Sequence, residues 1–299
     1  MSDLEDEVEE LEKKLKAAKA RLLAAQPNSP SSPAYLPNIG VDIGNGISNG
    51  TLSRPPISQH FLLLLSDSAL PLGSFAFSSG LESYLAHTKS ISRPSFPDFL
   101  DFSLSSYASS TLPFVLGAHR NPLDLVSLDD ALDAAIMCTV GRRASIAQGR
   151  ALLSIWDRSF SSALPAGVEP VIVETLKEFS LLLKSSSSVV TPGEIPPASA
   201  HLAPLFGAIA AILGMSLQQT AYVFMLSHVK ALLSAAVRAS MFGPYHAQKV
   251  LASAEVQRGI GECIEREWDT KVEDAGQSVP VMDLWIGRHE MLYSRIFNS

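Results

Sequence analysis

The stretch Ala76-Phe-Ser-Ser-Gly80 is where the sequence comes nearest to a nucleophile motif. It is one residue away from the Gly-x-Ser-x-Gly elbow of α/β-hydrolases, which needs a preceding strand and a downstream acid and histidine. No strand is predicted before Ser78, and the surrounding chain is typical of helices. We therefore interpret Ser78 as a turn or capping serine, and keep a serine hydrolase that uses Ser78 as an alternative.

Metal and phosphate motifs are missing from the sequence. The seven histidines form no His-x-His or His-Glu-x-x-His pattern, and Cys138 and Cys263 are too far apart for a Cys-x-x-Cys pair. There is no Gly-x-x-x-x-Gly-Lys-Ser/Thr loop, and Gly44-Asn-Gly46 followed by Gly50 misses the dinucleotide spacing. We predict no catalytic residue, no metal site and no cofactor. His228, inside an apolar helix, is expected to be a hydrogen-bonded core histidine.

Three arginines lie close together at Arg142, Arg143 and Arg150. A guanidinium has a planar fork of donors that suits carboxylates and carbonyls. Two interpretations stay open: these side chains bind acidic groups, of this chain or of a partner, or they form an ordinary solvated helix face.

Composition excludes several classes of protein. The chain has 299 residues, 46% of them hydrophobic, and a net charge of −7. This favours a globular protein without the basic footprint of a nucleic-acid binder. Two cysteines indicate a reducing compartment rather than a disulfide framework. The acidic start is unlike a secretory signal. We therefore expect a cytoplasmic protein that binds neither nucleic acid nor membrane.

An apolar segment at residues 216–242 predicts the helix around which the fold is organised. Ser216 and Gln219 have capping-box spacing, and Gly243-Pro244 ends the helix. Apolar residues cover most of its circumference, so other helices must surround it. His228, Lys230 and Arg238 interrupt the run before it reaches the ~18 apolar residues of a membrane span. The sequence therefore predicts an all-α, multi-helix bundle around this central helix.

Two N-terminal segments differ from the rest. Residues 1–25 are predicted to form a charged amphipathic helix: Ser2 and Glu5 are spaced as a capping box, and apolar residues from Leu4 to Leu22 have heptad spacing. Either this helix self-associates or it is a solubilising helix without a partner. Residues 26–57 are rich in Pro, Gly and Ser and predict a disordered linker.

The domain proper is predicted to span 58–299. Further helices are expected over 96–116, 127–152, 171–183 and 245–268, with a flexible insertion near 184–198. Asp129 suits the positive end of the second of these helices. Between the first apolar turns and Tyr84, Pro71 and Gly73 force a tight connection, which Phe75 and Phe77 are expected to anchor in the core.

That connection carries a family resemblance. The pattern Leu-Pro-x-Gly-x-Phe-x-x-Ser-x-Gly-Leu-Glu after an apolar helix resembles the opening of the urease accessory protein UreF. Here it runs through the following residues: Leu70, Pro71, Gly73, Phe75, Ser78, Gly80, Leu81 and Glu82. Many family members have a second glycine where this chain has Ser74.

Three later segments resemble the same family, in the same order. One runs from Arg142 to Leu152 as Arg-x-x-Ser-x-x-x-Gly-Arg-x-Leu. The next is His201-x-x-x-x-Phe206-Gly207, followed by Ala221-Tyr-Val-Phe224 and Ala235-Ala-Val-Arg238. The last is the ending His289-Glu-x-x-Tyr-Ser-Arg-Ile-Phe-x-Ser299, in which Ile296 replaces a more common leucine.

The resemblance implies a function for surfaces rather than for an active site. UreF-like proteins are non-catalytic scaffolds that bridge UreD (also called UreH) and the GTPase UreG, in an assembly that inserts nickel into urease apoprotein. They often form homodimers. Nickel would be the cargo of this assembly. By this resemblance the tail at 283–299 would order on UreD/UreH, and Arg238 either contacts or regulates the GTPase or makes an intramolecular bond.

The resemblance also implies two sets of residues. Those implied to bind partners are Arg238, His289, Glu290, Tyr293, Ser294, Arg295 and Phe297. Those of the structural motif are Pro71, Gly73, Phe75, Gly80, Glu82 and Gly207. Besides the Ser78 hydrolase, a generic coiled-coil adaptor that works through its N-terminal heptads remains an alternative.

Overall fold

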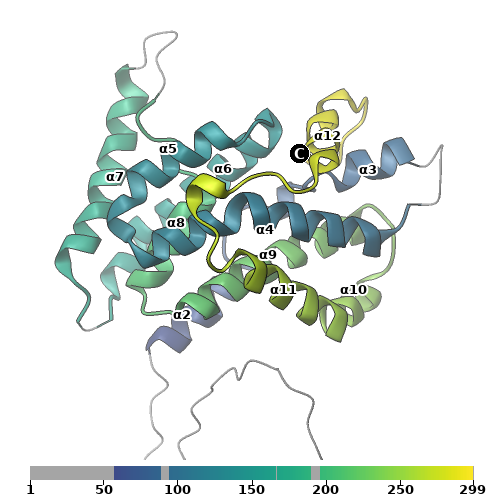
Figure 1. Cartoon of the computed structure of the whole chain (residues 1–299). Coiled ribbons are helices and arrows are strands. Elements are labelled where there is room, and N and C mark those ends of the chain that lie inside the picture. Colours follow the sequence, from purple (N-terminus) through teal and green to yellow (C-terminus); the bar gives the residue numbers. More distant parts are fainter. Residues whose placement is uncertain (1–56, 89–93, 166, 190–195, 299) are drawn as a thin grey trace, which may run out of the picture. The chain divides into compact units, whose positions relative to one another are not determined.

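The computed structural model describes residues 57–298 except 89–93, 166 and 190–195, and throughout these ranges the secondary structure is helical, without strands (Figure 1). Its α-helices are α2 (Ile57–Ser66), α3 (Leu81–Thr88), α4 (Phe96–Arg120), α5 (Leu125–Ala135), α6 (Thr139–Arg158), α7 (Pro170–Val189), α8 (Leu202–Ile212), α9 (Leu217–Arg238), α10 (Pro244–Leu251), α11 (Ala254–Glu267) and α12 (Pro280–Arg288). The predicted all-α fold is confirmed. The heptad helix at 1–25 and nearly all of the predicted linker at 26–57 lie outside the described residues.

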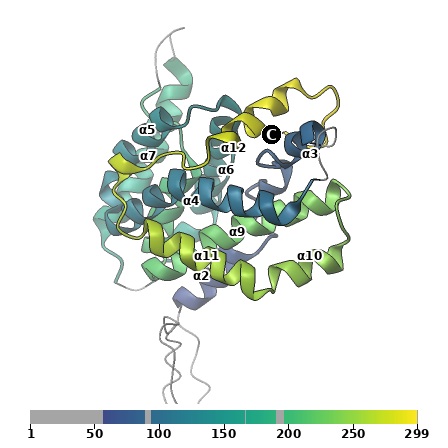
Figure 2. The same ribbon diagram turned by 45° about the vertical axis from the view of Figure 1, so that its right-hand side comes forward.

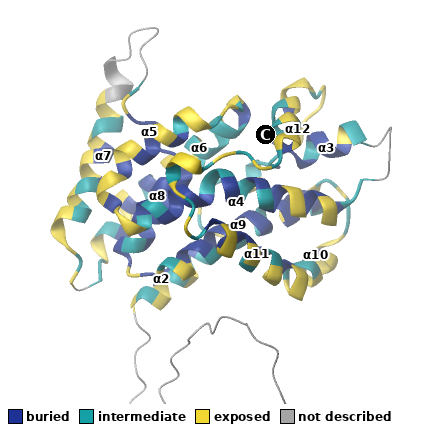
Figure 3. Ribbon diagram, in the orientation of Figure 1, coloured by how far each residue is buried: buried dark blue, intermediate teal, exposed yellow. Residues whose placement is uncertain are grey.

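The core forms where α4 crosses α8. Ten of the eleven residues of α8 are buried, and the helix is dark over almost its whole length in Figure 3. Gly207 permits this close contact, because a Cβ atom there would lie 2.2 Å from the carbonyl oxygen of Val115 in α4. α4 also packs against α5, α9 and α11, so it runs through the middle of the bundle.

The helix predicted at 216–242 is α9, which ends at Arg238, four residues before the predicted end at 242. The capping box is present: Ser216 Oγ accepts a hydrogen bond from Gln219 N at 3.1 Å, and Gln219 Oε1 accepts one from Ser216 N at 3.0 Å. Half of its 22 residues are buried. α9 therefore shares the centre with α4 and α8. By length and composition alone α9 could also cross a membrane, a test that the core helix of a soluble protein passes as well.

Two helices predicted as continuous are each divided. Ile136–Cys138 interrupts the helix predicted at 127–152, and separates α5 from α6. In one straight helix, Asp133 and Arg142 would lie about 13.5 Å apart along the axis. The break instead brings the Arg142 guanidinium to the Asp133 carboxylate, at 2.6 and 3.0 Å. The helix predicted at 245–268 also breaks, where Ser253 caps α11 by accepting a hydrogen bond from Val256 N.

α7 forms the edge of the bundle at the left of Figure 1. It begins at Pro170 and continues through the serine run to Val189, beyond the expected start of the insertion at 184. Residues 190–195 of the predicted insertion lie outside the described part of the chain. At the opposite side, α3 and α12 lie next to each other, and the C-terminus ends beside them in both views (Figures 1 and 2).

Candidate partner-binding surface

The turn before α3 is built by its glycines. Gly73 and Gly80 have φ angles of 73° and 87°, in the left-handed region that glycine adopts without strain. A Cβ atom on Gly80 would lie 3.1 Å from the backbone nitrogen of Ile286, so this glycine lets α12 approach the turn. Ser78 is fully buried, and its hydroxyl accepts a hydrogen bond from Glu82 N at 3.5 Å. Ser78 therefore sits as a turn serine.

Phe75 departs from the expectation. Its side chain is 65% exposed, so the prediction that it anchors the connection in the core is wrong. Its carbonyl oxygen instead accepts a hydrogen bond from the Arg238 guanidinium. The turn is thus held through its backbone, while the Phe75 ring lies at the surface.

Glu82 joins this turn to the C-terminal tail. Its carboxylate accepts hydrogen bonds from Ile296 N at 2.6 Å and from Phe297 N at 3.2 Å. It also accepts one from Nε2 of the fully buried His289 at 3.0 Å. The other ring nitrogen of His289, Nδ1, is buried and has no partner among the described residues. One carboxylate thus gathers three donors from the last eleven residues of the chain.

The end of the tail is anchored in the bundle. The Phe297 ring is 4% exposed and packs against the Arg238 guanidinium, whose central carbon lies 4.3 Å from the ring centroid. Asn298 N donates a hydrogen bond to Ala76 O at 2.8 Å. Because Arg238 also holds Phe75, the C-terminal end of α9 clamps the turn and the tail together. This is the intramolecular bond that the sequence left open for Arg238.

Between these anchors, the Glu290 carboxylate binds two arginines. Its carboxylate binds Arg143 of α6, and also Arg295 at 3.0 Å. The hydrogen bonds from Arg143 and then Arg295 hold the pKa of Glu290 below its ordinary value. Arg143 therefore binds an acidic group of this chain, as Arg142 does. Arg150 differs, since its Nε donates to the backbone oxygen of Ser199.

The side chains between the anchors point into solvent. Tyr293 is fully exposed, Met291 is 74% exposed and Ile296 is 62% exposed. Ser294 is exposed as well. We call Met291, Tyr293 and Ile296 the tail ridge. A largely apolar ridge on a backbone held at both ends is suited to binding a partner.

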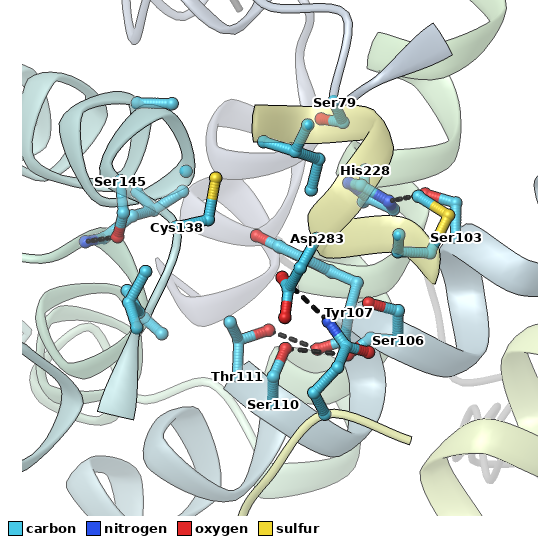
Figure 4. Close-up of a pocket in the computed structure, with 18 of the residues that line it drawn as sticks. Ser79, Ser103, Ser106, Tyr107, Ser110, Thr111, Cys138, Ser145, His228 and Asp283 are labelled. Carbon is cyan, nitrogen blue, oxygen red and sulfur yellow. Dashed lines mark hydrogen bonds between the residues drawn. The ribbon is translucent and has the colours of Figure 1, made fainter. Parts of the chain in front are cut away.

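A separate cavity of about 140 Å³ lies between α4, α6, α9 and α12 (Figure 4). His228 is hydrogen-bonded to Ser103 Oγ at 2.9 Å, which confirms the predicted core histidine. Burial lowers the pKa of His228 to about 3, so its imidazole is a poor general base at neutral pH. Asp283 binds Gln277 rather than this pair, so no serine–histidine–acid triad forms here. Within the described ranges, no group of three or more His, Cys, Asp or Glu could hold a metal ion.

Comparison with known proteins decides the family. The UreF family model matches residues 92–255, more than half of the chain. The chain belongs to the UreF family. It is 34% identical over 240 residues to a UreF-like urease accessory protein of Schizosaccharomyces pombe, covering 80% of this chain and 97% of the relative. It is 31% identical to urease accessory protein F of Oryza sativa subsp. indica, covering 78% of this chain and 82% of that one.

A bacterial relative extends the same likeness. The urease accessory protein UreF of Paenarthrobacter aurescens is 30% identical over 243 residues, which cover 81% of this chain and 98% of the relative. The chain is thus similar to fungal, plant and bacterial urease accessory proteins over most of their length. Membership of this family supports a role in urease maturation.

Most of the residues singled out by the UreF resemblance meet at one place. Those in or against the tail and its turn are Phe75, Gly80, Glu82, Arg238, His289, Glu290, Arg295 and Phe297. Pro71 and Gly73 lie just before them in the turn, whereas Gly207 belongs to the α4–α8 contact. Sequence reasoning missed Arg143 as a neighbour of the tail and Met291 as one of its exposed residues. For Arg143 the sequence offered one signal, the interpretation that it binds an acidic group of this chain.

Proposed function

We propose that this chain is a non-catalytic scaffold of urease maturation that bridges UreD/UreH and the GTPase UreG in the cytosol. In this role it assists and regulates GTP-dependent insertion of nickel, the cargo, into urease apoprotein, and it works as a homodimer. Family membership supports the urease role. The observation that carries the proposal for UreD/UreH is the exposed tail ridge on a backbone fixed by Glu82 and Arg238.

The tail ridge has the chemistry of an interface anchor. Aromatic side chains dominate the binding energy of many protein interfaces, and a ring loses little conformational entropy when it is buried. Tyr293 exposes its whole side chain, and Met291 and Ile296 extend the apolar surface beside it. Because Glu82 already holds the backbone at Ile296 and Phe297, little further ordering is needed on binding. We propose that UreD/UreH receives Tyr293 in an apolar pocket.

Arg238 stabilises the turn and the tail that carries this ridge. Its guanidinium contacts the Phe75 carbonyl and the Phe297 ring, so we propose that it acts on UreD/UreH binding by positioning the tail. Direct contact of Arg238 with UreG remains a prediction from the resemblance. An Arg238 variant that weakens the binding of UreD/UreH and of UreG equally would support direct contact of Arg238 with UreG. A variant that weakens only UreD/UreH would support the positioning role.

The experiment is copurification of tagged UreD/UreH and UreG with the full chain and three variants. One variant lacks residues 289–299, one lacks residues 1–25, and one carries Tyr293→Ala. We expect the tail deletion and Tyr293→Ala to lose UreD/UreH, and the N-terminal deletion to keep both partners. Tyr293→Ala matters because the tail deletion also removes buried Phe297 and His289, which affects folding.

Two results would contradict the proposal. If Tyr293→Ala and the tail deletion both copurify UreD/UreH normally, the tail is not the interface. If only the deletion of residues 1–25 loses the partners, the coiled-coil adaptor is the better account.

A further inference from the structure

A second surface, separate from the tail, lies where α6 faces α7. A groove of about 400 Å³ runs between these helices. Its polar lining consists of Arg150, Ser154, Asp157, Arg158, Ser180 and Lys184. We call this the α6–α7 groove. No hydrogen bond or ion pair joins these side chains to the described part of the tail. Of the three arginines of the sequence cluster, Arg150 is the one without a carboxylate partner among the described residues.

The groove is basic in a chain that is acidic overall. Three basic side chains face one carboxylate here, whereas the whole chain has 30 acidic and 23 basic residues. Asp157 is already engaged: it accepts a hydrogen bond from Ser180 Oγ at 2.7 Å and lies 3.9 Å from Lys184 Nζ. It therefore neutralises at most one of the three cations.

The two arginines keep donors available for a ligand. Arg150 uses its Nε on the Ser199 carbonyl at 3.3 Å, which orients the guanidinium and leaves its terminal nitrogens. The Arg158 side chain is exposed, and it makes no hydrogen bond or ion pair with the described residues. A guanidinium binds a carboxylate through two parallel hydrogen bonds, which gives the contact a defined orientation.

The distance between Arg150 and Arg158 bears on the kind of anion that the groove can bind. Arg150, Ser154 and Arg158 recur every four residues, so they lie on one face of α6, and the two arginines are separated by about 12 Å along the helix. A ligand with two separated anionic groups can bind both guanidiniums without requiring the two side chains to converge. An extended peptide covers that distance in about four residues, at roughly 3.3 Å per residue. Leu153 and Leu183 line the groove between these polar side chains, so its surface is mixed in polarity.

We propose that the α6–α7 groove binds an acidic segment of a partner protein, with carboxylates spaced about two helical turns apart on Arg150 and Arg158. The segment lies along the groove, with Lys184 opposite it on α7. This gives the scaffold a docking site independent of the tail ridge. Loss of one site therefore leaves binding at the other unchanged.

The test uses the full chain and a fluorescein-labelled octaglutamate peptide, with binding followed by fluorescence anisotropy at low salt. Arg158→Gln removes one cation, and Arg158→Glu reverses it. Arg258→Glu is the control, because Arg258 is an exposed arginine of α11 that pairs only with neighbouring Glu262 among the described residues. Thermal melting of each variant checks folding. We expect Arg158→Gln to weaken binding several-fold, Arg158→Glu at least about tenfold, and Arg258→Glu less than twofold.

Two outcomes overturn the inference. One is equal weakening by Arg158→Glu and Arg258→Glu, which would show that only net charge matters. The other is displacement of the peptide by inorganic phosphate at equal or lower concentration, which would make the groove a phosphate site. Selective loss in both Arg158 variants, with phosphate a weak competitor, supports the acidic segment.

Discussion

Two carboxylates accept hydrogen bonds from backbone nitrogens in different parts of this molecule. Asp129 of α5 accepts hydrogen bonds from the backbone nitrogens of Ser199, Ala200 and His201, at 2.6, 3.0 and 2.6 Å, and so caps the start of α8. Glu82 of α3 accepts hydrogen bonds from two backbone nitrogens of the tail. Each region also has a fully buried histidine paired with a carboxylate. The chemistry is shared, but the surroundings are not.

The cap of α8 lies in the core, whereas the Glu82 contacts end at the surface. Asp129 is fully buried, and beside it Gly149 leaves no room for a side chain, since a Cβ atom would lie 2.1 Å from Ala200 O. The tail instead carries the exposed tail ridge. Its backbone can return to water if the contacts break, which the start of α8 cannot do without opening the core. The same kind of bond therefore stabilises the core in one region and holds the exposed tail ridge in the other.

The largest effect is expected at the buried cap. Asp129→Ala leaves three backbone N–H groups without their acceptor, and each buried unsatisfied donor costs about 1–3 kcal/mol. We expect the free energy of unfolding in urea to fall by about 3–5 kcal/mol. Neighbouring Asp130 is exposed, so Asp130→Ala is the control and should change it by less than about 0.5 kcal/mol. Similar losses in both variants would refute the special role of the cap.

A smaller and more local effect is expected at Glu82. Glu82→Gln keeps the shape of the side chain but removes the charge that strengthens its bonds to Ile296 N and Phe297 N. We expect a loss of about 1–2 kcal/mol in unfolding free energy. Amide hydrogen exchange should become faster at Ile296 and Phe297, and stay unchanged in α8. A loss as large as that of Asp129→Ala would erase the distinction between the two regions.

Sequence alone predicted the parts of both regions that are local. The capping box of α9, the helical class and the turn at Pro71 depend on neighbouring residues, and the structure has them. Asp129 was expected to serve its own helix, but it caps α8, seventy residues further along. No local pattern encodes such a partner, because the contact exists only after the helices pack.

The candidate surface was predictable only as a set of segments. The UreF resemblance named Glu82 and the tail separately, and the structure shows that they touch. The exposed Phe75 ring was missed, because an aromatic residue in a tight turn ordinarily predicts burial. The break between α5 and α6 was missed for a related reason: the bond between Arg142 and Asp133 stabilises a break that helix propensity does not predict.

The smallest effect is a pH dependence confined to the tail. The pKa of Glu290 is lowered in the folded chain, so Glu290 stabilises the folded tail fully above its ordinary pKa of about 4.3. This stabilisation is lost as the pH falls below that value. Amide exchange in the tail should therefore accelerate on acidification, relative to the intrinsic rate. In Glu290→Gln this acid-dependent step should be absent. An unchanged acid response in Glu290→Gln would show that another group holds the tail.

Asp133, a partly buried carboxylate of α5 that binds the buried His201, gives a second pH test of the comparison. Although partial burial opposes the shift, hydrogen bonds from Arg142 and then His201 lower the pKa of Asp133. Its contribution is likewise lost as the pH falls, but we expect this loss in global unfolding rather than in tail exchange. Asp133→Asn should thus flatten the acid side of the urea-stability profile, while the tail response is retained.

The most direct test is the affinity of the full chain for purified UreD/UreH, measured by titration calorimetry for the wild type, Tyr293→Ala and Tyr245→Ala. Tyr245 is the matched control, since it is 91% exposed on α10, away from the tail. We predict that Tyr293→Ala weakens binding at least about tenfold with an unchanged urea midpoint, and that Tyr245→Ala binds as the wild type does. Wild-type affinity in Tyr293→Ala, or equal losses in the two variants, would contradict the proposal that the tail ridge is the docking surface.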